Sequence, residues 1–217
     1  FGLPILLAKA VFNAVALVVD GRIAGVVAKR ALAGDGIHYE PRWFKPWPRG
    51  ESVTITLCGQ RVRMGDIHFD LGGIKLGFEI CEDAWIAERP GVELALDAVD
   101  IILNPSASHF SFGKHEVRRR LVLEGSRAFG VSYLYANLLG NEAGRVIYDG
   151  DALIATAGEL LAEAPRFSFT EGHLISATID VELTRTRHAW RSSHHPRLAA
   201  AEDSVVELDW SPPTDAQ

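Results

Sequence analysis

The stretch that decides the fold is Leu76-Gly77-Phe78-Glu79-Ile80-Cys81-Glu82-Asp83-Ala84-Trp85. It is largely apolar up to Cys81, then acidic and then aromatic, which is typical of a buried strand that ends at a turn. A cysteine at that point can be held rigidly and still be reached by a ligand, so Cys81 is a candidate nucleophile. The alternative is a buried and inert cysteine, because free cysteine is among the most buried residue types.

The segments around this stretch predict an α/β fold. From residue 74 to 136 strands and helices alternate over 74–80, 92–99, 100–103, 114–129 and 131–136, which favours parallel neighbouring strands. Upstream, Asp20-Gly21 favours a hairpin between strands 11–19 and 22–28. Downstream, a meander of short strands is predicted over 145–148, 152–155, 160–164 and 174–179. We expect one domain over residues 1–180 and an extended arm over 181–217.

The helix predicted over 114–129 is amphipathic, with apolar and basic residues on different faces. The apolar face is expected to point inward and contains Val117, Leu121, Ala128 and Phe129. The arginines are expected to point largely outward, and they are Arg118, Arg119, Arg120 and Arg127.

The composition by itself points to no particular function. A hydrophobic content of 47% with 23% charged residues is typical of a soluble globular protein. The net charge of −6 gives no indication of nucleic acid or an anionic membrane as a partner, and the apolar runs are too short to span a bilayer. Cys58 and Cys81 form neither a CxxC pair nor a disulfide framework, which favours a reducing, cytoplasmic setting.

Several polar residues could accompany Cys81. A reactive thiolate needs a cation or oriented donors, and the acidic residues after Cys81 supply neither. Lys29, at the end of a predicted strand, could hold developing negative charge, or it could be a solvated strand-end lysine. Glu40 lies in a loop rich in aromatic residues, where it could act on a ligand or form a surface pair with Arg42.

A further candidate region is the segment 104–114, which follows the predicted strand 100–103. Loops at the carboxyl ends of strands are where α/β folds bind ligands. Ser108 offers a hydroxyl and Lys114 a cation. Together they suit a small ligand that carries both an amino group and a carboxylate.

Other kinds of site are less well supported. His188 with His194-His195 could suggest a metal, but no acid or cysteine has ligand spacing around them, so no metal site is predicted. The serines and histidine of 106–109 lack the G-x-S-x-G turn of a serine hydrolase. The basic residues of 114–127 could suggest phosphate or nucleic acid, but glutamates dilute them, and a solvated helix face is expected.

These residues resemble the nitrilase (carbon–nitrogen hydrolase) superfamily, and within it the glutaminase domain of glutamine-dependent NAD synthetases. The similarity covers residues 1–180. It rests on ordered blocks at 2–4, 12–14, 29, 39–44, 77–85, 104–114, 135–142 and 146–150.

The resemblance implies the α-β-β-α sandwich of the nitrilases and hydrolysis of the glutamine amide through a thioester on Cys81. It assigns Lys29, with the backbone N–H that follows Cys81, to the oxyanion. It assigns Glu40 to orienting that lysine and the departing ammonia. Ser108 and Lys114 fall where the family contacts glutamine. It implies no cofactor for this step, and it implies a homo-oligomer.

The chain departs from the family pattern in two ways. The family's general base is a glutamate before the Gly-Leu-Pro block, whereas the first glutamate here is Glu40. The resemblance therefore implies an N-terminally incomplete fold and poor activity. No SGGxDS-type loop is present, so ATP and deamido-NAD would belong to a synthetase domain outside this chain. The alternatives are a module without its base that serves assembly, and a stand-alone amidase for another small amide.

Overall fold

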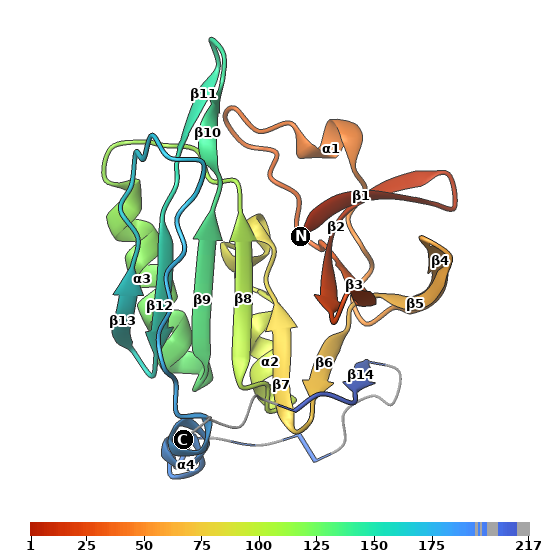
Figure 1. Cartoon of the computed structure of the whole chain (residues 1–217), viewed down its shortest axis with the longest axis vertical. Coiled ribbons are helices and arrows are strands. Elements are labelled where there is room, and N and C mark those ends of the chain that lie inside the picture. Colours follow the sequence, from red (N-terminus) through yellow and green to blue (C-terminus); the bar gives the residue numbers. More distant parts are fainter. Residues whose placement is uncertain (194, 196, 199–203, 212–217) are drawn as a thin grey trace. The chain divides into compact units, whose positions relative to one another are not determined.

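The computed structural model describes residues 1–193, 195, 197–198 and 204–211. The chain divides into two compact units, Phe1–Gly77 with Arg197–Gln217, and Phe78–Pro196. The boundary between the two units, at residues 77 and 78, lies inside the range 1–180 that the sequence predicts as one domain. Figure 1 shows the strands and helices of each unit.

The first unit is built on a five-stranded sheet with the order β1-β2-β3-β5-β4. Its strands are β1 (Gly2–Leu7), β2 (Ala10–Val19), β3 (Arg22–Ala28), β4 (Ser52–Leu57) and β5 (Gln60–Gly65). β3 and β5 are parallel, and the other neighbours pair antiparallel. The predicted hairpin at Asp20-Gly21 is confirmed. Both turn residues have positive φ (49° and 76°), as a type I′ turn requires.

The same unit contains a second set of strands and one short helix. β6 (His68–Leu71) pairs antiparallel with β7 (Ile74–Phe78) and parallel with β14 (Val205–Leu208). α1 (Glu40–Trp43) is a single helical turn. β3 ends in the buried run Val26–Ala28, of which Val26 and Ala28 pack with Met64 and Trp47. Residue 29 follows this run and therefore lies in a buried part of the unit.

The second unit has the strand order β13-β12-β9-β8. These strands are β8 (Ile101–Ser106), β9 (Ser132–Asn137), β12 (Ala152–Thr156) and β13 (Glu159–Glu163). β8 and β9 are parallel and are joined through α3 (Lys114–Phe129), so the predicted α/β crossover is confirmed. The remaining elements are a 3-10 helix (Cys81–Ala84), α2 (Gly91–Leu96), α4 (Val181–Ala189) and the hairpin of β10 (Leu139–Glu142) and β11 (Val146–Asp149).

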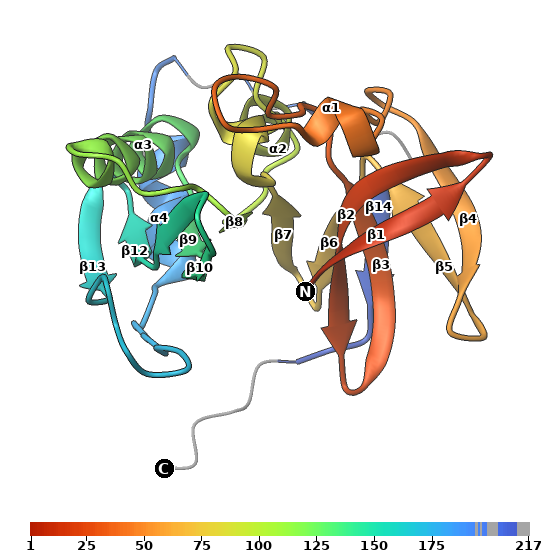
Figure 2. The ribbon, with the colours of Figure 1, turned by 90° about the horizontal axis from the view of Figure 1, so that it is seen from above.

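Helix α3 covers β9 and β12 (Figure 2), and its inward face differs from the prediction. Val122 is fully buried in the core with Tyr133 and Leu153. Arg118, predicted to point outward, is also fully buried, whereas Val117 is 48% exposed. The prediction failed because apolar periodicity takes no account of Asp149, a buried carboxylate that pairs with Arg118.

The C-terminal part also differs from the prediction. Residues 174–179 form no strand, and α4 and β14 occupy the region predicted as an extended arm. Asp180 caps α4 by accepting a hydrogen bond from the Leu183 amide at 2.8 Å. Arg185 pairs with the buried Asp100 at 2.7 Å. The arm prediction for residues 194, 196, 199–203 and 212–217 lies outside the described residues. Among the helices of the described part, none is long and apolar enough to cross a membrane.

Candidate active site

Cys81 lies at a constrained turn in the second unit. It begins the 3-10 helix that follows β7, and its side chain is partly buried. Its φ is +50°, a left-handed conformation that residues other than glycine adopt rarely and often at functional sites. The Ile80 amide donates to Asp83 Oδ2 at 3.1 Å and closes the turn. The geometry therefore agrees with the predicted delivery of Cys81 by a strand.

A buried carboxylate anchors the chain just before Cys81. Glu79 is fully buried and accepts hydrogen bonds from Arg89 Nε at 2.9 Å, the Gly91 amide at 2.7 Å and the Tyr133 hydroxyl at 2.6 Å. Burial alone would lower the pKa of Arg89, but the hydrogen bond and charge of Glu79 raise it. Sequence reasoning missed this anchor, and its only signal was a lone carboxylate within an apolar strand.

Replacing Glu79 with glutamine should destabilise this unit. Arg89 would lose its charged partner in a buried setting, so we expect the free energy of unfolding to fall by about 2–3 kcal/mol. Denaturant unfolding measures this. Glu124→Gln is the control, because its pair with Arg127 is solvent-exposed and should contribute nothing measurable. Equal unfolding midpoints for Glu79→Gln and Glu124→Gln would contradict the anchor.

Ser108 and Lys114 lie in the same unit as Cys81. Ser108 is buried, and its backbone exchanges two hydrogen bonds with the side chain of Asn137, at 2.8 and 2.9 Å. Lys114 Nζ lies 3.2 Å from His109 Nδ1.

The pKa of Lys114 is lowered from its ordinary value. Burial, and next the charge of Arg118, lower the pKa of Lys114, while interactions with Cys81, Asp149 and Glu82 act in the opposite direction. The family resemblance implies only substrate binding for Lys114.

Lys29 and Glu40 form a buried ion pair in the first unit. Lys29 is 2% exposed, and its Nζ lies 2.5 Å from Glu40 Oε2. Glu40 also accepts hydrogen bonds from Asn13 Nδ2 at 2.6 Å and from the Ala33 amide at 2.7 Å. The alternative of a solvated Lys29 is wrong, and Glu40 holds the ammonium of Lys29. Asn13 was missed as a site residue, although its segment belongs to the blocks that carry the family resemblance.

Comparison with known proteins identifies the family. The carbon-nitrogen hydrolase family model matches residues 9–189. The chain belongs to the carbon–nitrogen hydrolase family.

Two of the matched proteins are similar to this carbon–nitrogen hydrolase over most of its length. It is 33% identical to the glutamine-dependent NAD(+) synthetase of Saccharomyces cerevisiae, over 96% of the chain and 30% of that protein. A crystal structure of a glutamine-dependent NAD(+) synthetase from Cytophaga hutchinsonii has a TM-score of 0.70 and 44% identity, over 78% of this chain and 27% of that one.

A carbon-nitrogen hydrolase from Helicobacter pylori shares the fold, with a TM-score of 0.69 and 24% identity, over 87% of this chain and 64% of that one. The predicted nitrilase fold and hydrolase class are thus confirmed. The chain spans about 30% of the curated relatives that it matches.

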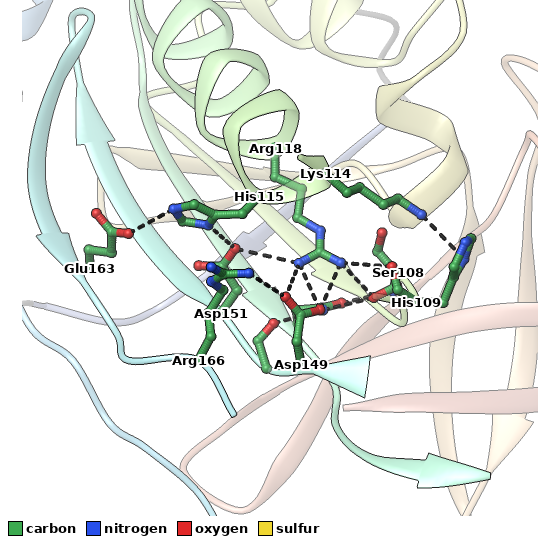
Figure 3. A network of polar contacts seen from close by, with 11 residues as sticks. Ser108, His109, Lys114, His115, Arg118, Asp149, Asp151, Glu163 and Arg166 are labelled. Atoms are coloured by element: carbon green, nitrogen blue, oxygen red, sulfur yellow. Dashed lines mark hydrogen bonds and ion pairs between the residues drawn. The ribbon is translucent and has the colours of Figure 1, made fainter. Parts of the chain in front are cut away.

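One group of side chains among the described residues has ligand atoms close enough to hold a metal ion: His115, Asp151 and Glu163. The imidazole lies between the two carboxylates, with Nδ1 3.0 Å from Asp151 and Nε2 3.1 Å from Glu163 (Figure 3). Both ring nitrogens are thus engaged, and Arg118 Nη1 lies 3.6 Å from Asp151. The imidazole thus bridges the two acids. His194, part of the earlier metal hypothesis, lies outside the described residues.

Proposed function

We propose that this carbon–nitrogen hydrolase domain releases ammonia from the side-chain amide of glutamine and supplies it to a synthetase domain that makes NAD. The observation that carries the proposal is the constrained Cys81, accompanied in its own unit by the Lys114 cation and the buried Ser108. The similarity to glutamine-dependent NAD synthetases over almost the whole chain supports glutamine as the amide.

The proposed chemistry is acyl transfer. The Cys81 thiolate attacks the amide carbon, ammonia leaves, and water cleaves the thioester to release glutamate. Lys29 and the backbone N–H that follows Cys81 stabilise the oxyanion of the tetrahedral intermediate. Glu40 orients Lys29 and the departing ammonia. Ser108 and Lys114 hold the amino and carboxylate groups of glutamine.

The amidase step is proposed to use neither metal nor cofactor, with ATP and deamido-NAD acting at the synthetase domain. Poor activity of the isolated chain, a cytoplasmic setting and a homo-oligomer stay predictions of the sequence. So do the roles in assembly or on another small amide, which the following assay separates from glutamine hydrolysis.

The test is a substrate panel on the full-length product of the gene that encodes this chain. Glutamine, asparagine and simple aliphatic amides are compared by ammonia release, and glutamate is quantified separately. We expect kcat/KM for glutamine to exceed that for asparagine by about tenfold or more, which corresponds to about 1.4 kcal/mol of discrimination. Equal rates for all amides would favour a general amidase, and no ammonia from any of them would refute the proposal.

The lowered pKa of Lys114 predicts how glutamine binding depends on pH. Because burial lowers this pKa below 10.5, the ammonium loses its proton at a lower pH than an ordinary lysine. We expect the glutamine Kd to rise toward alkaline pH, and the rise to move to higher pH in Lys114→Arg, since arginine stays protonated. Calorimetry in a Cys81→Ala background measures this without titration of the thiol. The amino group of glutamine titrates in both proteins, so coincident curves would contradict a charged role for Lys114.

A further inference from the structure

The geometry points to Arg118 as a positioning residue that fixes both candidate glutamine contacts, Ser108 and Lys114, relative to each other. This inference rests on the proposed function. Arg118 is fully buried, and Figure 3 shows its guanidinium between Asp149 and the loop that carries Ser108.

The guanidinium of Arg118 binds both the carboxylate of Asp149 and the backbone of the loop. Nη1 donates to Asp149 Oδ1 at 2.9 Å and Oδ2 at 3.0 Å, which neutralises the buried charge. Nη2 also donates to Asp149 Oδ1, at 3.0 Å, and it donates to the backbone oxygens of Ser108 at 2.9 Å and His109 at 3.0 Å. A planar fork of donors can meet a carboxylate and two carbonyls at once, whereas a lysine ammonium is a single point of attachment.

The loop is held from a second side as well. Ser108 O also accepts from Asn137 Nδ2 at 2.9 Å, and the Ser108 amide donates to Asn137 Oδ1 at 2.8 Å. The Ser108 peptide is therefore clamped between α3, through Arg118, and the end of β9, through Asn137. These hydrogen bonds fix the backbone of Ser108 and therefore the position of its Cβ, which carries the hydroxyl.

Lys114 is coupled to the same guanidinium. It lies four residues before Arg118 on α3, so both side chains share one helix face. Lys114 Nζ lies 3.2 Å from the ring of His109, whose carbonyl Arg118 holds. Arg118 thus ties the loop that presents Ser108 to the helix that presents Lys114. Losing the hydrogen bonds of the Arg118 guanidinium should weaken recognition of the amino acid part of glutamine, while the thiol of Cys81 stays reactive.

Arg166 provides a matched control. Its Nη1 donates to the same carboxylate, at 3.2 Å from Asp149 Oδ2, but its side chain is 31% exposed. Arg166→Lys changes an arginine on Asp149 in the same chemical way as Arg118→Lys. It leaves the hydrogen bonds from Arg118 to the loop in place.

The test compares glutamine with a probe that lacks the amino acid part. In Arg118→Lys we expect the glutamine KM of the full-length protein to rise about tenfold or more, since that loss corresponds to about one charge-assisted hydrogen bond. The rate at which iodoacetamide alkylates Cys81, and kcat, should change far less. Arg166→Lys should change neither quantity. Asn137→Ser, which removes the second clamp, should raise KM to a smaller extent.

Each result has one interpretation. The inference is overturned if the KM of Arg118→Lys is unchanged, or if alkylation of Cys81 slows as much as KM rises. In either case, glutamine hydrolysis by the wild type still supports the proposed function. If Arg118→Lys does not fold, an unchanged KM in Asn137→Ser overturns it instead. If the wild type does not use glutamine, the proposed function fails, and the inference fails with it.

Discussion

Replacing Cys81 with alanine is expected to lower glutamate release by roughly 10⁴-fold or more, since the covalent route has no other nucleophile. In the proposed mechanism the thiol forms the thioester, so its loss would remove the acylation step instead of weakening it. Residual turnover would come only from binding and from the oxyanion donors. Initial rates of glutamate formation by the full-length protein measure the effect.

Cys58→Ala is a close control for this substitution. Cys58 is exposed in the turn between β4 and β5, and it has the same φ of +50° as Cys81. Alanine is therefore placed in the same left-handed conformation at both positions, so the backbone cost is matched. We expect Cys58→Ala to keep the wild-type rate. If Cys81→Ala retains more than about a hundredth of that rate, far above what removal of a nucleophile allows, the thioester mechanism is wrong.

Mass spectrometry of the quenched reaction supplies an independent readout. With glutamine present, the peptide that carries Cys81 should gain the mass of a glutamyl group, and the peptide that carries Cys58 should not. Covalent intermediates accumulate when their hydrolysis is slower than their formation. A glutamyl adduct on any other residue would place the nucleophile elsewhere.

The sequence predicts the elements that depend on neighbouring residues. The Asp20-Gly21 hairpin, the crossover from β8 to β9 and the turn at Cys81 all follow from local patterns of apolar, glycine and acidic residues. The sequence does not predict burial that depends on a distant partner. Arg118 appeared solvated because Asp149 is 31 residues away in the chain.

The same reason explains the two other differences. A solvated Lys29 was a reasonable alternative because Glu40, the partner that allows its burial, is identified by the fold and not by strand periodicity. Helix α4 has little apolar rhythm, and its order comes from the Asp180 cap and the pair between Arg185 and Asp100. Buried charges are thus the feature that local patterns miss, and the proposed chemistry uses one such pair, Lys29 with Glu40.

Replacing Lys29 with methionine is expected to lower kcat by about 10²–10³-fold, the usual loss for one oxyanion donor. Methionine keeps most of the apolar stem, and Glu40 keeps its hydrogen bonds from Asn13 and the Ala33 amide. KM for glutamine should change little, since an oxyanion donor acts mainly in the transition state. Steady-state kinetics of the full-length protein separate the two constants.

Arg30→Met controls for the loss of a cation beside this strand. Arg30 is the next residue, and it pairs with Asp66 at 2.8 Å, so its loss also breaks an ion pair in the first unit. We expect kcat of Arg30→Met to stay within about threefold of the wild type, because losing this pair affects stability more than transition-state charge. A similar fall in kcat for both variants would mean that Lys29 acts through the fold.

Glu40→Gln distinguishes the two roles within the ion pair. The amide keeps the shape of the side chain but leaves the ammonium of Lys29 without a negative partner in a buried setting, which typically costs about 3–5 kcal/mol of stability. Lys29→Met removes the cation itself, so it should lower kcat with a smaller fall in the unfolding midpoint. If instead Lys29→Met unfolds as readily as Glu40→Gln and keeps its kcat when folded, the pair only supports the sheet, and the oxyanion must be stabilised by other donors.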